Sequence, residues 1–197
     1  MATNQLRLPL WGTFDARLTL IRDYAIIPDL VSAQVAAGYW NLDLFLPFVT
    51  HPFIHASFLM TVFAGVLLLA IGKFVGEAMG NMAICIIFFA STIVGALAYL
   101  ILLPDTYPLF GGYPAVYGLI GAYTFVRFSD AQGLKTQQMR AFQLLAFLMV
   151  LNLVYTLVFG GPNTWMADLV GAITGFLLAA AMNPGGIPHL LETLRRR

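Results

Sequence analysis

Residues 78–104 read AMGNMAICIIFFASTIVGALAYLILLP and contain no Asp, Glu, Lys or Arg. A transmembrane helix needs about 20 consecutive, mainly apolar residues to cross roughly 30 Å of hydrocarbon, and charged side chains are costly at that depth. This stretch meets both requirements. Other windows free of these four residue types are 44–72, 106–126, 141–167 and 169–191. The sequence therefore predicts several membrane-spanning helices.

The composition of the whole chain supports the same class of protein. Of the 197 residues, 60% are hydrophobic and only 10% are charged, and the mean hydropathy is +0.84. Average soluble domains carry about 25% charged residues. The formal net charge of +1 offers no basic surface to nucleic acid, which is therefore not an expected partner. Cys85 is the only cysteine, so it forms no internal disulfide, and we interpret it as a packing residue.

Proline, glycine and polar residues divide the apolar windows into about five spans. We expect these spans near residues 51–72, 82–103, 111–126, 141–160 and 165–183. Asp168 interrupts the last of them. The predicted fold class is an all-α integral membrane protein with a single membrane domain.

Basic residues predict the orientation, because Lys and Arg accumulate on the cytoplasmic side of short loops. They follow the first predicted span, lie between the third and fourth, and close the chain: Lys73, Arg127, Lys135, Arg140, Arg195, Arg196 and Arg197. The loops on the opposite side, near 104–110 and 161–164, contain none. We expect a bacterial inner-membrane protein with a cytoplasmic C-terminus.

The start of the chain differs from the rest. Residues 1–24 have too short an apolar run to cross a bilayer. In the following stretch, 25–48, a proline and a glycine break the apolar pattern, and Tyr39 and Trp40 are adjacent. Such aromatic residues are typical of an interfacial segment. The predicted divisions are an extramembrane segment, 1–24, a membrane domain, 25–183, and a cytoplasmic basic tail, 184–197.

Polar residues inside the spans are the candidates for function, because lipid burial must be compensated by partners or water. They are His51, His55, Tyr113, Tyr117, Asn152 and Asp168. Asp168 is the strongest candidate among them. The two histidines are explained as structural partners of backbone groups near a helix end. Two ligands fall short of a zinc site, so neither a metal nor another cofactor is predicted.

Small residues recur at every fourth position in two spans. One row is Ala167, Gly171, Gly175 and Ala179, and the other is Pro114, Gly118 and Ala122. Rows of this kind let two helix backbones approach closely. We expect the third and fifth spans to pack along them, and we assign Gly111, Gly118, Gly171 and Gly175 to helix packing.

Three blocks of sequence occur in an informative order. They are FVTHPFIHASFLM at 48–60, GGYPAVYG at 111–118, and ADLVG at 167–171 followed by Gly175. They resemble the rhomboid family of intramembrane serine proteases over roughly residues 25–183. The first looks like the histidine-rich start of the second family helix. The others look like the Gly-x-Ser-Gly-Ala-x-x-Gly block of the fourth helix and the Ala-His-x-x-Gly-x-x-x-Gly block of the sixth. The resemblance implies a rhomboid-like helical bundle.

The resemblance also implies a catalytic site whose residues are replaced here. The family's serine nucleophile and histidine base correspond to Tyr113 and Asp168. The family's oxyanion-binding histidine and asparagine correspond to Met60 and Ala64. All four catalytic positions therefore depart from the family pattern.

Elementary chemistry argues against a substitute dyad. Tyrosine and aspartic acid have reference pKa values near 10 and about 3.9, and this gap opposes proton transfer by roughly 8 kcal/mol. Methionine and alanine offer no side-chain N–H to an oxyanion, and the loss of one such donor typically costs about 10²–10³ in rate. We predict a catalytically degenerate member with no active catalytic residue. If the rhomboid geometry holds, we expect Tyr113 and Asp168 to face each other, either as a structural lock in which the phenol donates to the carboxylate or as groups that take a direct part in gripping a client.

The family core has six helices, but no apolar span precedes residue 25. We expect either that the first family helix is absent or that the start of the chain has been placed too late.

Three functions remain open at this stage. The first is an inactive rhomboid, a pseudoprotease, that binds transmembrane segments of other membrane proteins through the gate that the resemblance implies between family helices two and five. The second is a fixed accessory subunit of a larger membrane complex. The third is an intramembrane protease with an atypical site. The expected partners are membrane proteins and the lipid bilayer. Candidate client contacts, with lipid-facing packing as the alternative, are Phe58, Leu59, Phe63, Phe142 and Phe147.

Overall fold

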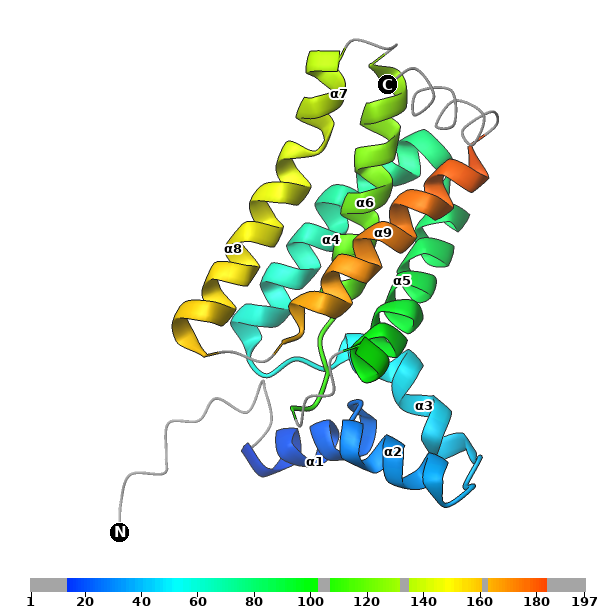
Figure 1. Cartoon of the computed structure of the whole chain (residues 1–197), viewed down its shortest axis with the longest axis vertical. Helices are drawn as coiled ribbons and strands as arrows, with labels where there is room; N and C mark the ends of the chain where they lie inside the picture. The colour runs from blue at the N-terminus through cyan, green and yellow to red at the C-terminus, as the bar shows by residue number, and fades with distance from the viewer. Residues whose placement is uncertain (1–13, 103–106, 132–134, 161–162, 184–197) are drawn as a thin grey trace.

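The computed structural model describes residues 14–102, 107–131, 135–160 and 163–183. Its main body is a bundle of five long helices that run in alternating directions (Figure 1). They are α4 (Phe58–Met79), α5 (Asn81–Leu102), α6 (Tyr113–Asp130), α8 (Gln143–Phe159) and α9 (Trp165–Met182). Within the described ranges the regular elements are helices, apart from one isolated β-bridge. The predicted all-α fold class is confirmed.

Four helical segments are long and apolar enough to cross a membrane. They are α4, α5, α9 and the segment Thr136–Val158, which combines most of α7 (Lys135–Ala141) with α8. The fifth helix, α6, is the least apolar of the bundle and is mostly buried among its neighbours. Because the other helices shield it from lipid, α6 tolerates polar residues that an exposed span would not. The expected set of five spans is thus four apolar helices around a more polar central one.

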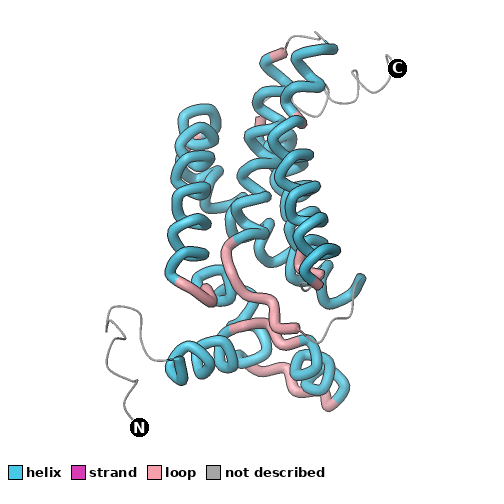
Figure 2. The backbone as a smooth tube through the Cα atoms, turned by 90° about the vertical axis from the view of Figure 1, so that its left-hand side faces the viewer, coloured by secondary structure: helices cyan, strands magenta, loops and turns pink. Residues whose placement is uncertain are grey.

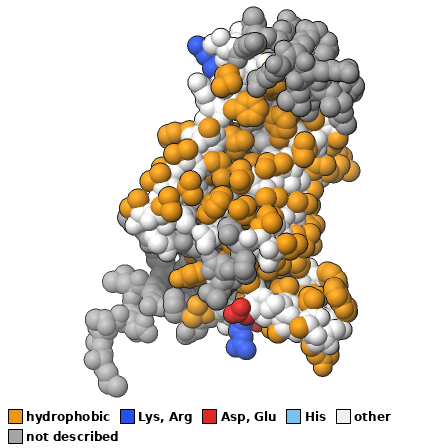
Figure 3. All heavy atoms as spheres, in the orientation of Figure 1, with side chains coloured by type: hydrophobic (Ala, Val, Ile, Leu, Met, Phe, Trp, Pro, Cys, Tyr) orange, Lys and Arg blue, Asp and Glu red, His pale blue; other side chains and the backbone are white. Residues whose placement is uncertain are grey.

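Hydrophobic side chains cover the visible flank of the bundle, and the few charged ones lie toward its two ends (Figure 3). Many large apolar side chains on α4, α5 and α8 are exposed, as expected of surfaces that face hydrocarbon. The protein is therefore an integral membrane protein.

Three shorter helices precede the bundle: α1 (Phe14–Tyr24), α2 (Pro28–Ala36) and α3 (Leu42–Thr50). They gather at one end of the bundle, and α1 and α2 lie across that end rather than along its axis (Figures 1 and 2). Tyr39 and Trp40, between α2 and α3, are 65% and 66% exposed. This placement agrees with the interfacial segment expected from the sequence.

A short backbone pairing joins this N-terminal segment to the bundle. The Ile26 N–H donates to the Leu109 carbonyl at 3.0 Å, and the Leu109 N–H donates back to the Ile26 carbonyl at 2.8 Å. Both side chains are buried. The interfacial helices are therefore attached to the loop that leads into α6.

The first span begins later than the sequence suggested. Residues His51–Phe53 form a short 3₁₀ helix, and α4 starts only at Phe58, where the Ser57 side chain accepts a hydrogen bond from the Met60 N–H at 3.3 Å. Serine at this position satisfies one of the free N–H groups of the first turn. The expected start near residue 51 was wrong because this cap, and not the apolar pattern, defines the helix end.

The glycine rows of α6 and α9 lie against each other. A Cβ on Gly171 would overlap the carbonyl of Pro114, and a Cβ on Gly175 would overlap the carbonyl oxygen of Gly118. Gly121 on α6 is equally close to the carbonyl of Ala172. The two backbones approach to a distance at which no side chain fits between them, which is the packing that small-residue rows permit.

Basic residues of the described bundle lie at the end away from α1 and α2. Lys73 is near the end of α4, Arg127 is in the last turn of α6, and Arg140 is in the last turn of α7. Lys73 forms an exposed ion pair with Glu77 at 3.9 Å. Arg195, Arg196 and Arg197 lie outside the described residues. The alternation of helices therefore brings these loop cations to one end of the bundle.

Candidate functional site

The N-terminus of α6 is formed by a glycine pair that the preceding histidine segment holds in place. Gly111 has φ +101°, a backbone conformation that residues with a Cβ rarely adopt. The Gly111 N–H donates to the His51 carbonyl at 2.9 Å, and the Gly112 N–H donates to His55 Nε2 at 3.4 Å. These contacts position Tyr113, the first residue of α6.

The two histidines lie within hydrogen-bonding distance of backbone groups. His51 is fully buried, and its Nδ1–H donates to the Pro47 carbonyl at 2.8 Å. Burial lowers the pKa of His51 to about 4, against a smaller opposite effect of this hydrogen bond. Burial also lowers the pKa of His55. His51 is therefore neutral at pH 7, and its neutral imidazole ties α3 to the loop that precedes α4.

Their positions do not form a helical metal-binding pair. His51 lies in the 3₁₀ helix and His55 in the extended stretch before α4, so the His-x-x-x-His spacing does not place them on one helical face. Within the described residues, no group of three or more His, Cys, Asp or Glu side chains is arranged to hold a metal ion.

A cavity of about 700 Å³ lies between α4, α6, α8 and α9. Most of its wall is apolar, and the polar lining residues include Tyr113, Asn152 and Asp168. Met60 also lines the cavity, whereas Ala64 is buried in α4 and is not part of the wall. The structure thus brings together three of the four positions that the rhomboid resemblance singled out.

Asp168 is buried in the first turn of α9 and is only 3% exposed. Asn152 of α8 donates to its Oδ2 from Nδ2 at 2.7 Å. The expected hydrogen bond from Tyr113 is not the one formed: Tyr113 shares the cavity wall, but the amide of Asn152 is the partner. An acidic side chain in the first turn of a helix is also stabilised by the helix dipole.

A second polar contact joins α8 to the centre of the bundle. The Tyr117 hydroxyl of α6 donates to the Leu148 carbonyl at 3.1 Å. Leu148 lies one helical turn before Asn152, so two hydrogen bonds on the same face of α8 hold this helix to α6 and α9. Much of the remaining surface of α8 is exposed.

The cavity offers little for nucleophilic catalysis. Among the described residues that line it, none is Ser, Cys, Lys or His. Its polar groups are phenols, threonine hydroxyls, one amide and one carboxylate. The one acid among the described lining residues, Asp168, is already hydrogen bonded to an amide, and an amide is a poor proton acceptor. The cavity therefore combines a mainly apolar wall with a few hydrogen-bonding groups.

Sequence reasoning missed several residues of the cavity wall. They are Tyr107, Tyr155, Thr156 and Thr164. A signal was available for two of them: Tyr155 and Thr156 follow Asn152 by three and four positions, and residues at this spacing share a helix face.

These features define a class: a polytopic helical membrane protein with a lateral cavity at the N-terminal ends of two glycine-packed helices. The family model for the Rhomboid domain matches residues 40–184. The chain belongs to the rhomboid family. The match begins within the interfacial segment, later than the resemblance starting near residue 25. Neither a curated protein nor a solved structure gives a match.

Proposed function

We propose that this chain is a proteolytically inactive rhomboid that binds transmembrane segments of other membrane proteins. One observation carries the proposal: Tyr113 and Asp168, which the rhomboid resemblance aligns with the family's nucleophile and base, both line a mainly apolar cavity. A serine and histidine work together because imidazole takes and returns a proton near neutral pH. A phenol beside a carboxylate that is bound to an amide cannot exchange a proton in this way near neutral pH. The cavity around the two side chains is nevertheless present.

The cavity reaches the lipid-facing surface between α4 and α8, which supports entry from the side. Met60 of α4 and Leu151 of α8 both line the cavity and are both about half exposed. Phe63 and Phe147, on the same two helices, are also exposed. α8 packs against α6, α7 and α9 more than against α4. A transmembrane helix that approaches from the bilayer would therefore contact apolar side chains at the boundary between α4 and α8, where these two helices pack loosely against each other.

Site-specific photo-crosslinking in membranes tests this binding. A benzophenone amino acid at Met60 is expected to cross-link several different membrane proteins through their transmembrane segments. The matched control is Ile173 on α9, which is also about half exposed but does not line the cavity. Equal products from both positions, or one partner at a fixed ratio from Met60, would contradict client binding. The fixed ratio would instead indicate an accessory subunit.

Inactivity has its own test. The purified chain is expected to leave a model transmembrane substrate intact and to react with no serine-directed phosphonate. Reproducible scission that is abolished by Tyr113→Phe or Asp168→Asn would establish a protease and end this proposal.

We also propose a bacterial inner-membrane location with the C-terminus in the cytoplasm. The orientation is supported by the basic end of the bundle formed by Lys73, Arg127 and Arg140. A reporter that fluoresces only in the cytoplasm, fused after Arg197, is expected to be bright. A fusion that is expressed at a normal level but does not fluoresce would contradict this orientation.

A further inference from the structure

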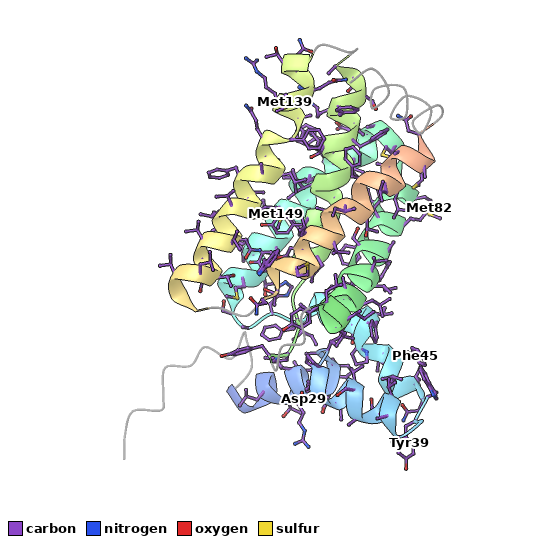
Figure 4. The ribbon with its side chains drawn as sticks, viewed as in Figure 1. Asp29, Tyr39, Phe45, Met82, Met139 and Met149 are labelled. Atoms are coloured by element: carbon purple, nitrogen blue, oxygen red, sulfur yellow. The ribbon has the colours of Figure 1, made fainter. Side chains whose placement is uncertain are left out.

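A second hollow lies outside the rhomboid cavity, where the interfacial helices meet the end of α5. Its volume is about 560 Å³, and residues of α2, α3 and the last two turns of α5 line it. The lining is apolar except for Asp29 and Ser32 (Figure 4 labels Asp29 and Phe45). Trp40 and Phe45 stack at 6.4 Å between ring centroids beside it. We call this hollow the interfacial groove.

The position of the groove matches the boundary between hydrocarbon and headgroups. Leu97 and Ile101 belong to a membrane-spanning helix that ends at Leu102. On the other side, Trp40 is mainly exposed and follows the interfacial helix α2. A tryptophan at the end of a span is typical of headgroup depth. A ligand here would have an apolar part along α5 and a polar part beside α2.

The charge of the groove indicates which polar part fits. Asp29 is exposed, and no ion pair joins it to another residue in the described part of the chain. The Ser32 hydroxyl donates to the Asp29 carbonyl at 2.9 Å, so its oxygen remains able to accept. A carboxylate and a hydroxyl oxygen suit a cation with N–H donors and repel an anionic headgroup.

We propose that the interfacial groove binds one phospholipid with a primary-amine headgroup. An acyl chain lies against Leu97 and Ile101, and the ammonium group donates to the Asp29 carboxylate and the Ser32 hydroxyl. An acid at this position also stabilises the first turn of α2, and that role alone would give no preference among lipids.

Quenching of Trp40 fluorescence by brominated lipids tests the proposal, because bromine quenches only at short range. The full chain, with Trp11→Phe and Trp165→Phe so that Trp40 is the sole tryptophan, is placed in bilayer discs. Ethanolamine, choline and glycerol phospholipids with the same brominated chains are compared. The ethanolamine lipid is expected to reach half-maximal quenching at a several-fold lower mole fraction than the other two.

Matched variants separate the headgroup from the acyl chain. Asp29→Asn is expected to abolish the preference for ethanolamine, whereas Asp43→Asn, which changes a neighbouring acid outside the groove, is expected to retain it. Leu97→Phe fills the groove and is expected to weaken quenching by every lipid. Val94→Phe is the control, since Val94 is similarly exposed on α5 but does not line the groove.

Several results would overturn the proposal. Equal quenching by the three headgroups, or a preference that survives Asp29→Asn, would refute recognition of the amine. An absence of quenching by any lipid would mean that a protein segment covers the groove. A further test uses the unsubstituted Asp29 and lipids whose ethanolamine headgroup carries one, two or three N-methyl groups. Quenching of Trp40 is expected to weaken along this series. A preference that does not decline would refute the proposal even if Asp29→Asn fails to fold.

Discussion

Removal of the amide of Asn152 is the perturbation that most directly tests how α8 is held. Asn152 donates to Asp168 at 2.7 Å, and Asp168 is only 3% exposed. The substitution Asn152→Ala leaves a buried carboxyl without its partner. An unsatisfied buried polar group costs about 1–3 kcal/mol in proteins, and more for a charged group.

The membrane reduces this figure, because a separated helix also finds other partners for its polar groups. Hydrogen bonds between helices in a bilayer average about 0.6 kcal/mol and reach about 1.7 kcal/mol. The bond here is short and lies in a buried site, which favours the upper part of that range. We therefore expect a coupling free energy of about 1.5 kcal/mol between Asn152 and Asp168.

The measurement is a double-mutant cycle from reversible unfolding in mixed micelles, with Asn152→Ala, Asp168→Ala and both together. Asn152→Ala alone is expected to lower the free energy of unfolding by about 2 kcal/mol. Leu157→Ala serves as the control on α8, since Leu157 is 74% exposed and lipid replaces its contacts. A coupling free energy near zero, or Asn152→Ala as stable as Leu157→Ala, would refute the proposed attachment of α8.

Other predictions concern the centre of the bundle and the segment that precedes it. Gly175→Ala is expected to lower stability by about 3 kcal/mol or more, because its Cβ would overlap the Gly118 carbonyl oxygen. Thermal unfolding compared with Ala180→Gly checks this, and a loss below about 0.5 kcal/mol would contradict it. Gly111→Ala is expected to lower the free energy of unfolding by about 1–2 kcal/mol because of the positive φ of Gly111. The same thermal unfolding experiment measures it. The control is Gly65→Ala, which is expected to be neutral or stabilising because Gly65 has open space around it and no positive φ. Since the native pKa of His51 is about 4, against an ordinary value of 6.5, the unfolded state binds the proton first as pH falls. Stability is therefore complete above about pH 6.5 and declines toward pH 4 by up to about 3 kcal/mol. His51→Asn, which keeps a donor for the Pro47 carbonyl, is expected to flatten this decline, and an unchanged pH profile would show that His51 does not cause it.

The large features of this fold were predictable because they depend on composition and spacing. Charge-free windows predicted the spans, since the cost of burying charge in lipid does not depend on tertiary detail. The glycine rows predicted which helices meet, since only small residues permit that approach. The start of α4 was not predictable from hydropathy, because the capping hydrogen bond of Ser57 defines it locally.

Only part of the site was predictable, and the partner of Asp168 was not. The rhomboid resemblance brought Tyr113, Asp168 and Met60 to one cavity wall. The hydrogen-bond partner of Asp168 depends on the rotation of α8 about its axis and on its position along the bundle. Neither follows from the spacing of residues in a single sequence. Asn152 was recognised as a polar residue within a span, yet its contact with Asp168 emerged only from the packed helices.

The backbone contact between α6 and α9 has a consequence for substitutions in the cavity wall. The two helices contact each other at Pro114, Gly118, Gly171 and Gly175. Backbone carbonyl groups of one helix lie against glycines of the other, which have no side chain. Tyr113 is the first residue of α6 and Asp168 lies in the first turn of α9, next to these contacts but not among them. A substitution at Tyr113 or Asp168 therefore leaves the close approach of the α6 and α9 backbones intact, because that approach depends on other positions.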